Sequence, residues 1–333
     1  MQMKKIIIIL LGILLIFSLT SCAPSRRQPV VVDFHEGTDG LELKFLERSP
    51  PDEVYEGDIF PLTVEMHNKG AEDITNGALL FSVERQYVHI PHEYTEGLAQ
   101  FSLMGRSTYD PVGGIDRKSV QLTAGTLDPQ SETHTTIVSV TACYPYKTAA
   151  TAQVCVDTDI FGQREEEKVC KPVMLKMGTV TKEGQELPKG QGAPIAVTKI
   201  EQKMLQHPDN PEMVRPQYLI YVRNMGDGLP VASNVYQNAC RATGISKQSW
   251  NVVGARVYLS DRSMQLNCRP KLDPNSADLR GHIKLEKKED FVQCTYDPGI
   301  LKTQGTYTAP LMIDLDYGYT LTISKNVMIR KQV

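Results

Sequence analysis

Residues 62 to 70 read Leu62-Thr63-Val64-Glu65-Met66-His67-Asn68-Lys69-Gly70, in which apolar and polar side chains alternate before an Asn-x-Gly ending. Alternation with a period of two places the apolar side chains on one face of an extended chain, so it predicts a half-buried β-strand. Asn and Gly both tolerate a positive φ, which a chain reversal at a strand end requires. This stretch therefore predicts a strand that ends in a tight turn.

Segments of the same kind recur along the chain, at residues 41–46, 60–66, 78–83, 119–123 and 136–142. Turn signals separate them, among them Pro-Pro, Glu-Gly-Asp, Asn-Lys-Gly and Gly-Gly. No segment sustains the i, i+3, i+4, i+7 spacing of an amphipathic helix over three turns. The sequence predicts an all-β fold.

The second half of the chain repeats features of the first. Residues 218 to 226, YLIYVRNMG, again alternate and end in Asn-x-Gly. Tyr144-Pro145-Tyr146 precedes Val154-Cys155 at the same spacing at which Tyr317-Gly318-Tyr319 precedes Val327-Met328. Two matches in the same order indicate an internal duplication. The matched tyrosines are expected to hydrogen-bond backbone near a sandwich corner rather than to form a sugar-binding platform.

These observations predict two tandem β-sandwich domains, at residues 41–180 and 193–333. The polar stretch between them, residues 181–192 (TKEGQELPKGQG), is interpreted as an interdomain linker because it carries glycine and proline and interrupts the strands.

The N-terminus predicts export. Lys4 and Lys5 precede a 14-residue apolar segment, 6–19, which is too short to span a bilayer comfortably and is typical of a signal peptide. Leu19-Thr20-Ser21-Cys22 resembles the lipobox of prokaryotic lipoproteins, which implies cleavage before Cys22 and lipidation of its thiol. An ordinary cleavable signal and an uncleaved anchor are the alternatives. Residues 23–40 are interpreted as a tether.

Six further cysteines agree with an oxidising compartment, and they allow fifteen complete pairings. Cys155 and Cys170 flank a charged, glycine-containing loop, and Cys268 and Cys294 flank another polar excursion, so each pair is a candidate local disulfide. Cys143 and Cys240 either pair across the domains or remain buried as small apolar residues.

Charge and motifs exclude several functions. Lys and Arg number 36 and Asp and Glu 39, without a basic stripe, which argues against nucleic-acid binding. No metal site, cofactor or catalytic residue is predicted. The carboxylate pairs Asp157/Asp159 and Asp314/Asp316 are better explained as solvated acids than as calcium ligands or hydrolytic acids. Trp250 precedes a predicted strand and is either a core residue or a ligand contact.

Pro50-Pro51, Val54-Tyr55-Glu56-Gly57-Asp58, the alternating strand and Asn68-Lys69-Gly70 together resemble the start of CARDB-like and related immunoglobulin-like domains of prokaryotic, especially archaeal, surface proteins. The resemblance is good over residues 41–90, looser to 180, and departs between Val231 and Trp250. It implies seven-stranded sandwiches of ~100 residues that serve as adhesive, spacer or scaffold modules.

The expected function is therefore that of a non-catalytic, membrane-anchored lipoprotein on the outer face of the cell membrane, with a protein or envelope component as its partner. The alternative is a module that binds a small ligand or polysaccharide in a cleft between the domains, which predicts an aromatic-lined pocket near Trp250 or the linker. A hydrolase would need converging carboxylates or a Ser-His pair, which the sequence does not display.

Overall fold

The computed structural model describes residues 34–332 apart from 96–97, 165–166, 183–184 and 242. Cys22, the predicted signal peptide and most of the predicted tether lie outside these residues. Residues 34–333 form one compact unit.

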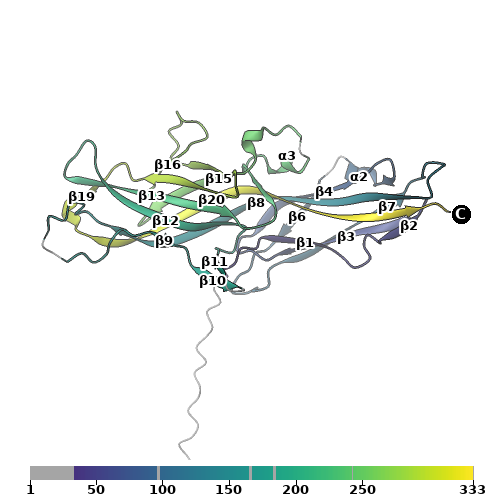
Figure 1. The fold of residues 1–333 in the computed structure, drawn as a ribbon, viewed down its shortest axis with the longest axis horizontal. Helices are drawn as coiled ribbons and strands as arrows, with labels where there is room; N and C mark the ends of the chain where they lie inside the picture. The colour runs from purple at the N-terminus through teal and green to yellow at the C-terminus, as the bar shows by residue number, and fades with distance from the viewer. Residues whose placement is uncertain (1–33, 96–97, 165–166, 183–184, 242, 333) are drawn as a thin grey trace, which may run out of the picture. The chain divides into compact units, whose positions relative to one another are not determined.

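Strands dominate this unit, so the prediction of an all-β chain is confirmed (Figure 1). A four-stranded sheet has the order β1 (Leu41–Phe45), β3 (Ile59–Asn68), β7 (Ile115–Ala124), β5 (Val88–His89). A six-stranded sheet contains β16 (Asn267–Arg269), β18 (Glu289–Thr295), β13 (Met213–Asn224), β12 (Ile195–Gln206) and β9 (Leu175–Lys176), with β19 (Ile300–Leu301) beside β13.

The largest sheet has eight strands. Its order is β17 (Gly281–Lys284), β15 (Val252–Leu259), β20 (Tyr307–Arg330), β8 (Thr133–Val156), β4 (Ile74–Val83) and β6 (Ala99–Leu103), and β14 (Leu229–Val231) and β2 (Glu53–Tyr55) also pair with β20. The β2–β20 pairing is parallel, whereas the other strand pairings described are antiparallel. Short helices are α2 (His92–Thr95), α3 (Tyr236–Cys240) and 3₁₀ turns at Lys247–Ser249 and Lys302–Gln304.

The two long strands β8 and β20 pair with each other along all 24 residues. Pro145 lies opposite Gly318 at the middle, so the two matched tyrosine motifs of the sequence face each other across the ribbon. β4 pairs with residues 138–143 of β8, and β15 pairs with residues 311–316 of β20. The two repeats are therefore joined through the strands that they share.

Burial follows the alternation read from the sequence. Leu62, Val64 and Met66 on β3 are fully buried, and their neighbours on the other face are partly exposed. Ile220 and Val222 on β13 show the same pattern. The apolar faces of the three large sheets contribute to one hydrophobic core, which agrees with the face-to-face packing of a β-sandwich.

The stretch interpreted as a linker contains a hairpin of β10 (Thr179–Lys182) and β11 (Gln185–Pro188). After the hairpin, the backbone is bound into the body: Gly37 N donates to Lys189 O at 2.9 Å, and Gly192 N donates to Gly37 O at 2.8 Å. Gly190 has a φ of +74°, and a Cβ there would collide with the Gly37 carbonyl. The end of the predicted tether thus packs directly on residues 189–192.

Candidate functional site

Four tyrosines meet at the middle of the β8–β20 ribbon. Tyr144 and Tyr146 come from β8, and Tyr317 and Tyr319 come from β20. All four are buried, and neighbouring ring centroids lie 5.6 to 6.2 Å apart. The rings form the apolar centre of the region in which the two repeats join.

Each repeat uses one of these tyrosines to hold its Asn-x-Gly turn. The Tyr319 hydroxyl donates to Asn224 Oδ1 at 3.0 Å and accepts from Gly228 N at 3.0 Å. The Asn224 amide closes the turn by donating to Gly228 O at 2.8 Å. Asparagine is required because it offers an acceptor and a donor in one short side chain.

The first repeat contains the same arrangement. The Tyr146 hydroxyl donates to Asn68 Oδ1 at 3.4 Å and accepts from Glu72 N at 3.3 Å, while Asn68 Nδ2 donates to Glu72 O at 2.9 Å. The sequence repeat therefore corresponds to a repeated hydrogen-bond network, and the expected tyrosine-to-backbone bonds are present.

The other two tyrosines contact the first strands of their repeats. The Tyr144 hydroxyl accepts from Leu41 N at 3.3 Å. The Tyr317 hydroxyl lies 3.0 Å from Thr148 Oγ1, which donates to Ile195 O at 2.7 Å. Burial raises the pKa of Tyr144 and of Tyr317 well above the ordinary tyrosine value. These phenols stay protonated and act as structural hydrogen-bonding groups.

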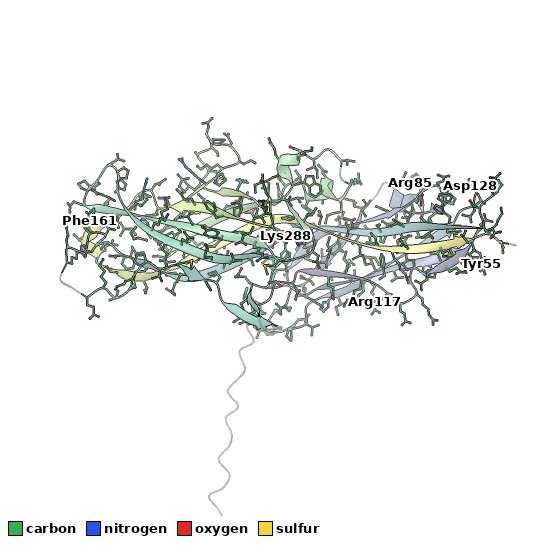
Figure 2. The ribbon with its side chains drawn as sticks, in the orientation of Figure 1. Tyr55, Arg85, Arg117, Asp128, Phe161 and Lys288 are labelled. Atoms are coloured by element: carbon green, nitrogen blue, oxygen red, sulfur yellow. A yellow bond between two sulfur atoms is a disulfide. The ribbon has the colours of Figure 1, made fainter. Side chains whose placement is uncertain are left out.

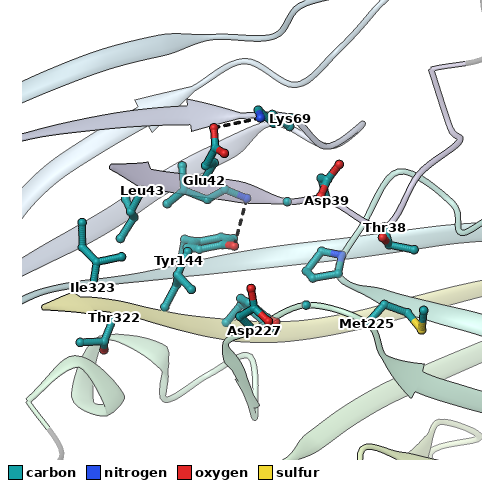
Figure 3. Close-up of a pocket in the computed structure, with 16 residues that line it drawn as sticks. Thr38, Asp39, Glu42, Leu43, Lys69, Tyr144, Met225, Asp227, Thr322 and Ile323 are labelled. Carbon is teal, nitrogen blue, oxygen red and sulfur yellow. Dashed lines mark hydrogen bonds and ion pairs between the residues drawn. The ribbon is translucent and has the colours of Figure 1, made fainter. Parts of the chain in front are cut away.

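A cavity of about 420 Å³ lies beside Tyr144, between β1, the two Asn-x-Gly turns and β20 (Figure 3). Its polar lining includes Asp39, Glu42, Lys69 and Asp227. Its remaining lining residues are Thr38, Gly40, Leu41, Leu43, Tyr144, Pro194, Met225, Gly226, Tyr319, Leu321, Thr322 and Ile323. The ligand-binding alternative predicts a cleft near Trp250 or the linker; this cavity has Pro194, just after the predicted linker, in its lining, but not Trp250.

Glu42 is the most strongly constrained charge in the cavity. Its carboxylate lies 2.9 Å from Lys69 Nζ and 3.0 Å from Lys44 Nζ. Partial burial alone would raise the pKa of Glu42, but the hydrogen bonds and charges of the two lysines outweigh it and hold the pKa below the ordinary value. The cavity thus offers an ion pair and free carboxylates for polar contacts, whereas the hydroxyls of Tyr144 and Tyr319 are already used on the backbone.

Sequence reasoning missed these lining residues, because Glu42, Lys69 and Asp227 are far apart in the chain. The available signal was the repeat itself. Lys69 lies in the first Asn-x-Gly turn and Asp227 directly follows the second, and the shared ribbon brings both turns to one cavity.

The candidate disulfide cysteines lie together in the pairs that the sequence favoured. Cys155 bonds to Cys170 and Cys268 bonds to Cys294, the latter across the paired strands β16 and β18. The remaining two cysteines also pair: Cys143 on β8 bonds to Cys240 on α3, across the boundary predicted between the domains.

Trp250 does not line the cavity. It follows the 3₁₀ turn Lys247–Ser249, its carbonyl accepts from Lys284 Nζ at 2.5 Å, and its side chain is partly exposed. The ligand contact suggested for Trp250 is therefore not part of this site.

The carboxylates of the pairs Asp157/Asp159 and Asp314/Asp316 form ion pairs with lysine and arginine side chains. Asp157 lies 2.7 Å and Asp159 3.8 Å from Lys168 Nζ. Asp314 forms an ion pair with Arg262, and Asp316 forms one with Arg280. Over the described part of the chain, no group of three or more His, Cys, Asp or Glu side chains is arranged to hold a metal ion.

No helix within the described residues has the length and apolar character needed to cross a membrane. No protein-family model and no curated protein matches the sequence. A solved structure, the secreted serine protease VesC from Vibrio cholerae, aligns over 84% of this chain and 50% of its own length, with 9% identity and a TM-score of 0.19. This chain thus spans half the length of that protein, and a likeness at this level carries no functional argument.

Proposed function

We propose that the protein is a non-catalytic lipoprotein of the outer cell-membrane face, built from two immunoglobulin-like sandwiches of the CARDB-like kind, which presents its loops to a protein or envelope partner. The three disulfides carry this proposal, because such bonds persist in oxidising compartments outside the cytoplasm. They fasten the loop after β8 and α3 to β8, and they join β16 to β18, so the body holds a fixed surface for recognition.

The shared ribbon supports an interaction or scaffold role. β8 and β20 each serve both repeats, and the buried tyrosines fix the turns at their junction. Side-chain packing fills the interior, which leaves loops and sheet edges for contact with a partner. The end of the predicted tether packs on residues 189–192, so a lipid on Cys22 would hold the body through the segment bound there.

Mass spectrometry of the full chain, purified from membranes, tests the anchor. A diacylated Cys22 at the mature N-terminus is expected, and a Cys22→Ser control should leave the membrane fraction. An intact leader, or cleavage elsewhere, would contradict lipid anchoring. Proximity labelling on intact cells then tests the interaction role, which predicts envelope partners that are labelled by the anchored chain and lost with Cys22→Ser.

The 420 Å³ cavity favours a second candidate function, the binding of a polar ligand such as a saccharide. Ile323→Trp would fill the cavity, because Ile323 lines it and lies on the same face of β20 as Tyr319 (Figure 3). Ser324→Trp is the control, because Ser324 lies on the opposite face of the strand, where it bonds Ser139, and is not part of the lining. Calorimetric titration with envelope saccharides should show binding that Ile323→Trp abolishes and Ser324→Trp retains. Equal effects of the two substitutions would exclude this site.

A further inference from the structure

The loop between β6 and β7, together with the first residue of β7, exposes four apolar side chains to solvent. Tyr109 is 99% exposed, Met104 65%, Val112 57% and Ile115 53%. We refer to these four residues as the apolar tip. Exposed apolar residues are common when they occur singly, and here four fall within residues 104–115.

Hydrogen bonds hold this loop in shape. The Asp110 carboxylate accepts from Val112 N at 3.2 Å and Gly113 N at 3.1 Å, and Ser107 N donates to Asp110 O at 2.8 Å. His67 Nε2 lies 2.9 Å from Val112 O. The exposure of the tip is thus built into the loop, and little conformational entropy is lost when the tip binds.

The same loop hydrogen-bonds to the first described residues of the chain. The Arg106 guanidinium donates to Phe34 O at 3.1 Å and to Glu36 O. Arg106 is three residues from Tyr109, so the chain enters the body beside the apolar tip. Eleven residues, 23 to 33, separate Cys22 from Phe34, and even fully extended they span at most about 40 Å.

We propose that the apolar tip docks into the interfacial region of the lipid bilayer to which Cys22 is anchored. This inference rests on the lipid anchor of the proposed function. The short tether makes docking intramolecular, so weak contacts suffice. Tyrosine suits the headgroup region because its ring is apolar and its hydroxyl is polar.

Apolar insertion, rather than charge attraction, drives this docking. Arg106 is engaged with backbone carbonyls of the N-terminal segment. On β7, which follows the loop, Lys118 pairs with Asp116, and Arg117 pairs with Glu65 of the neighbouring strand β3. Docking should therefore be insensitive to salt, unlike the binding of a polybasic surface to anionic lipid.

The test uses the full lipidated chain in vesicles of phosphatidylethanolamine and phosphatidylglycerol. Trp250→Phe removes the native tryptophan, and Tyr109→Trp reports on the tip. Its emission should shift to the blue and be quenched by brominated acyl chains, and added Val112→Asp should reverse both effects. Phe161→Trp is the matched control, because Phe161 is also exposed, at 60%, and lies on the loop after β8 (Figure 2); it should show neither effect.

Hydroxyl-radical footprinting of the unsubstituted chain gives an independent measurement. Oxidation of Tyr109 should fall at least about threefold on anchoring, because an immersed ring loses water contact, while oxidation of Phe161 stays unchanged. Diacylated Cys22 with an unshifted, unprotected position 109 would overturn the docking alone. Absence of lipid on Cys22 would overturn the anchor itself. Protection that requires envelope proteins would assign the tip to a protein partner and refute lipid docking.

Discussion

Removing the Tyr319 hydroxyl should destabilise the protein more than removing its counterpart on Tyr146. Both Tyr→Phe substitutions delete one donated and one accepted hydrogen bond at an Asn-x-Gly turn. At Tyr319 both distances are 3.0 Å, and the Gly228 N–H that loses its acceptor is buried. At Tyr146 the distances are 3.4 and 3.3 Å, and Glu72 is only partly buried.

A net hydrogen bond contributes about 1 kcal/mol, and a buried N–H left without a partner costs about 1 to 3 kcal/mol. We therefore expect Tyr319→Phe to lower the free energy of unfolding by about 2 to 3 kcal/mol, and Tyr146→Phe by about 1 kcal/mol, because its bonds are long and water can replace one of them. Tyr55→Phe is the control: Tyr55 is exposed (Figure 2), so the change should be below about 0.5 kcal/mol.

Urea denaturation with the disulfides intact, followed by circular dichroism, measures these differences. Both substitutions should shift one shared transition, because β8 and β20 each belong to both repeats. Equal costs for Tyr319→Phe and Tyr146→Phe would refute the geometric argument. Two separate transitions would refute the coupling of the repeats through the ribbon.

Two further predictions concern the disulfides and the cavity. Replacing Cys143 and Cys240 by Ala opens a loop with a sequence separation of 97 and should lower the free energy of unfolding by about 5 kcal/mol in the chain-entropy model. Replacing Cys155 and Cys170, with a separation of 15, should lower it by about 3 kcal/mol. Denaturation of the two double variants measures both costs, and the reverse order would contradict the model. The pKa of Glu42 is lowered in the folded state, so its ionised form adds stability above the unfolded carboxyl pKa of about 4.3 and loses it as pH falls. Glu42→Gln should therefore be less stable than the parent chain near neutral pH, with the difference vanishing in acid; a constant difference would mean that packing rather than charge is lost.

The all-β class was predictable because it depends on local alternation, as in Leu62 to Gly70, where the buried positions are those that the pattern indicated. The matched tyrosine motifs were also visible. That they pair with each other was not, because strand register between distant segments depends on tertiary packing that no local period records. Residues 181–192 were predicted as a linker, and part of this stretch belongs to the β10–β11 hairpin; the sequence does not separate the two, because Gly, Pro and charged residues are common in both linkers and hairpin turns.

The candidate site was less predictable than the fold. The cavity brings together residues from β1, two turns and β20, and no local motif in the sequence marks them as parts of one site. Trp250, the single tryptophan, was a candidate ligand contact, but it is not among the residues that line the cavity. The presence of a rare residue type does not indicate where the fold places it. The cysteine pairs 155–170 and 268–294 were easier to anticipate, because each flanks one polar excursion of the chain.

The pairing of Pro145 with Gly318 also has a consequence for the integrity of the chain. β8 and β20 run antiparallel about this point, which is the relation between identical strands at a twofold dimer interface. A cut in the β10–β11 hairpin would place β8 in one fragment and β20 in the other. Each fragment would then need the other to complete the eight-stranded sheet.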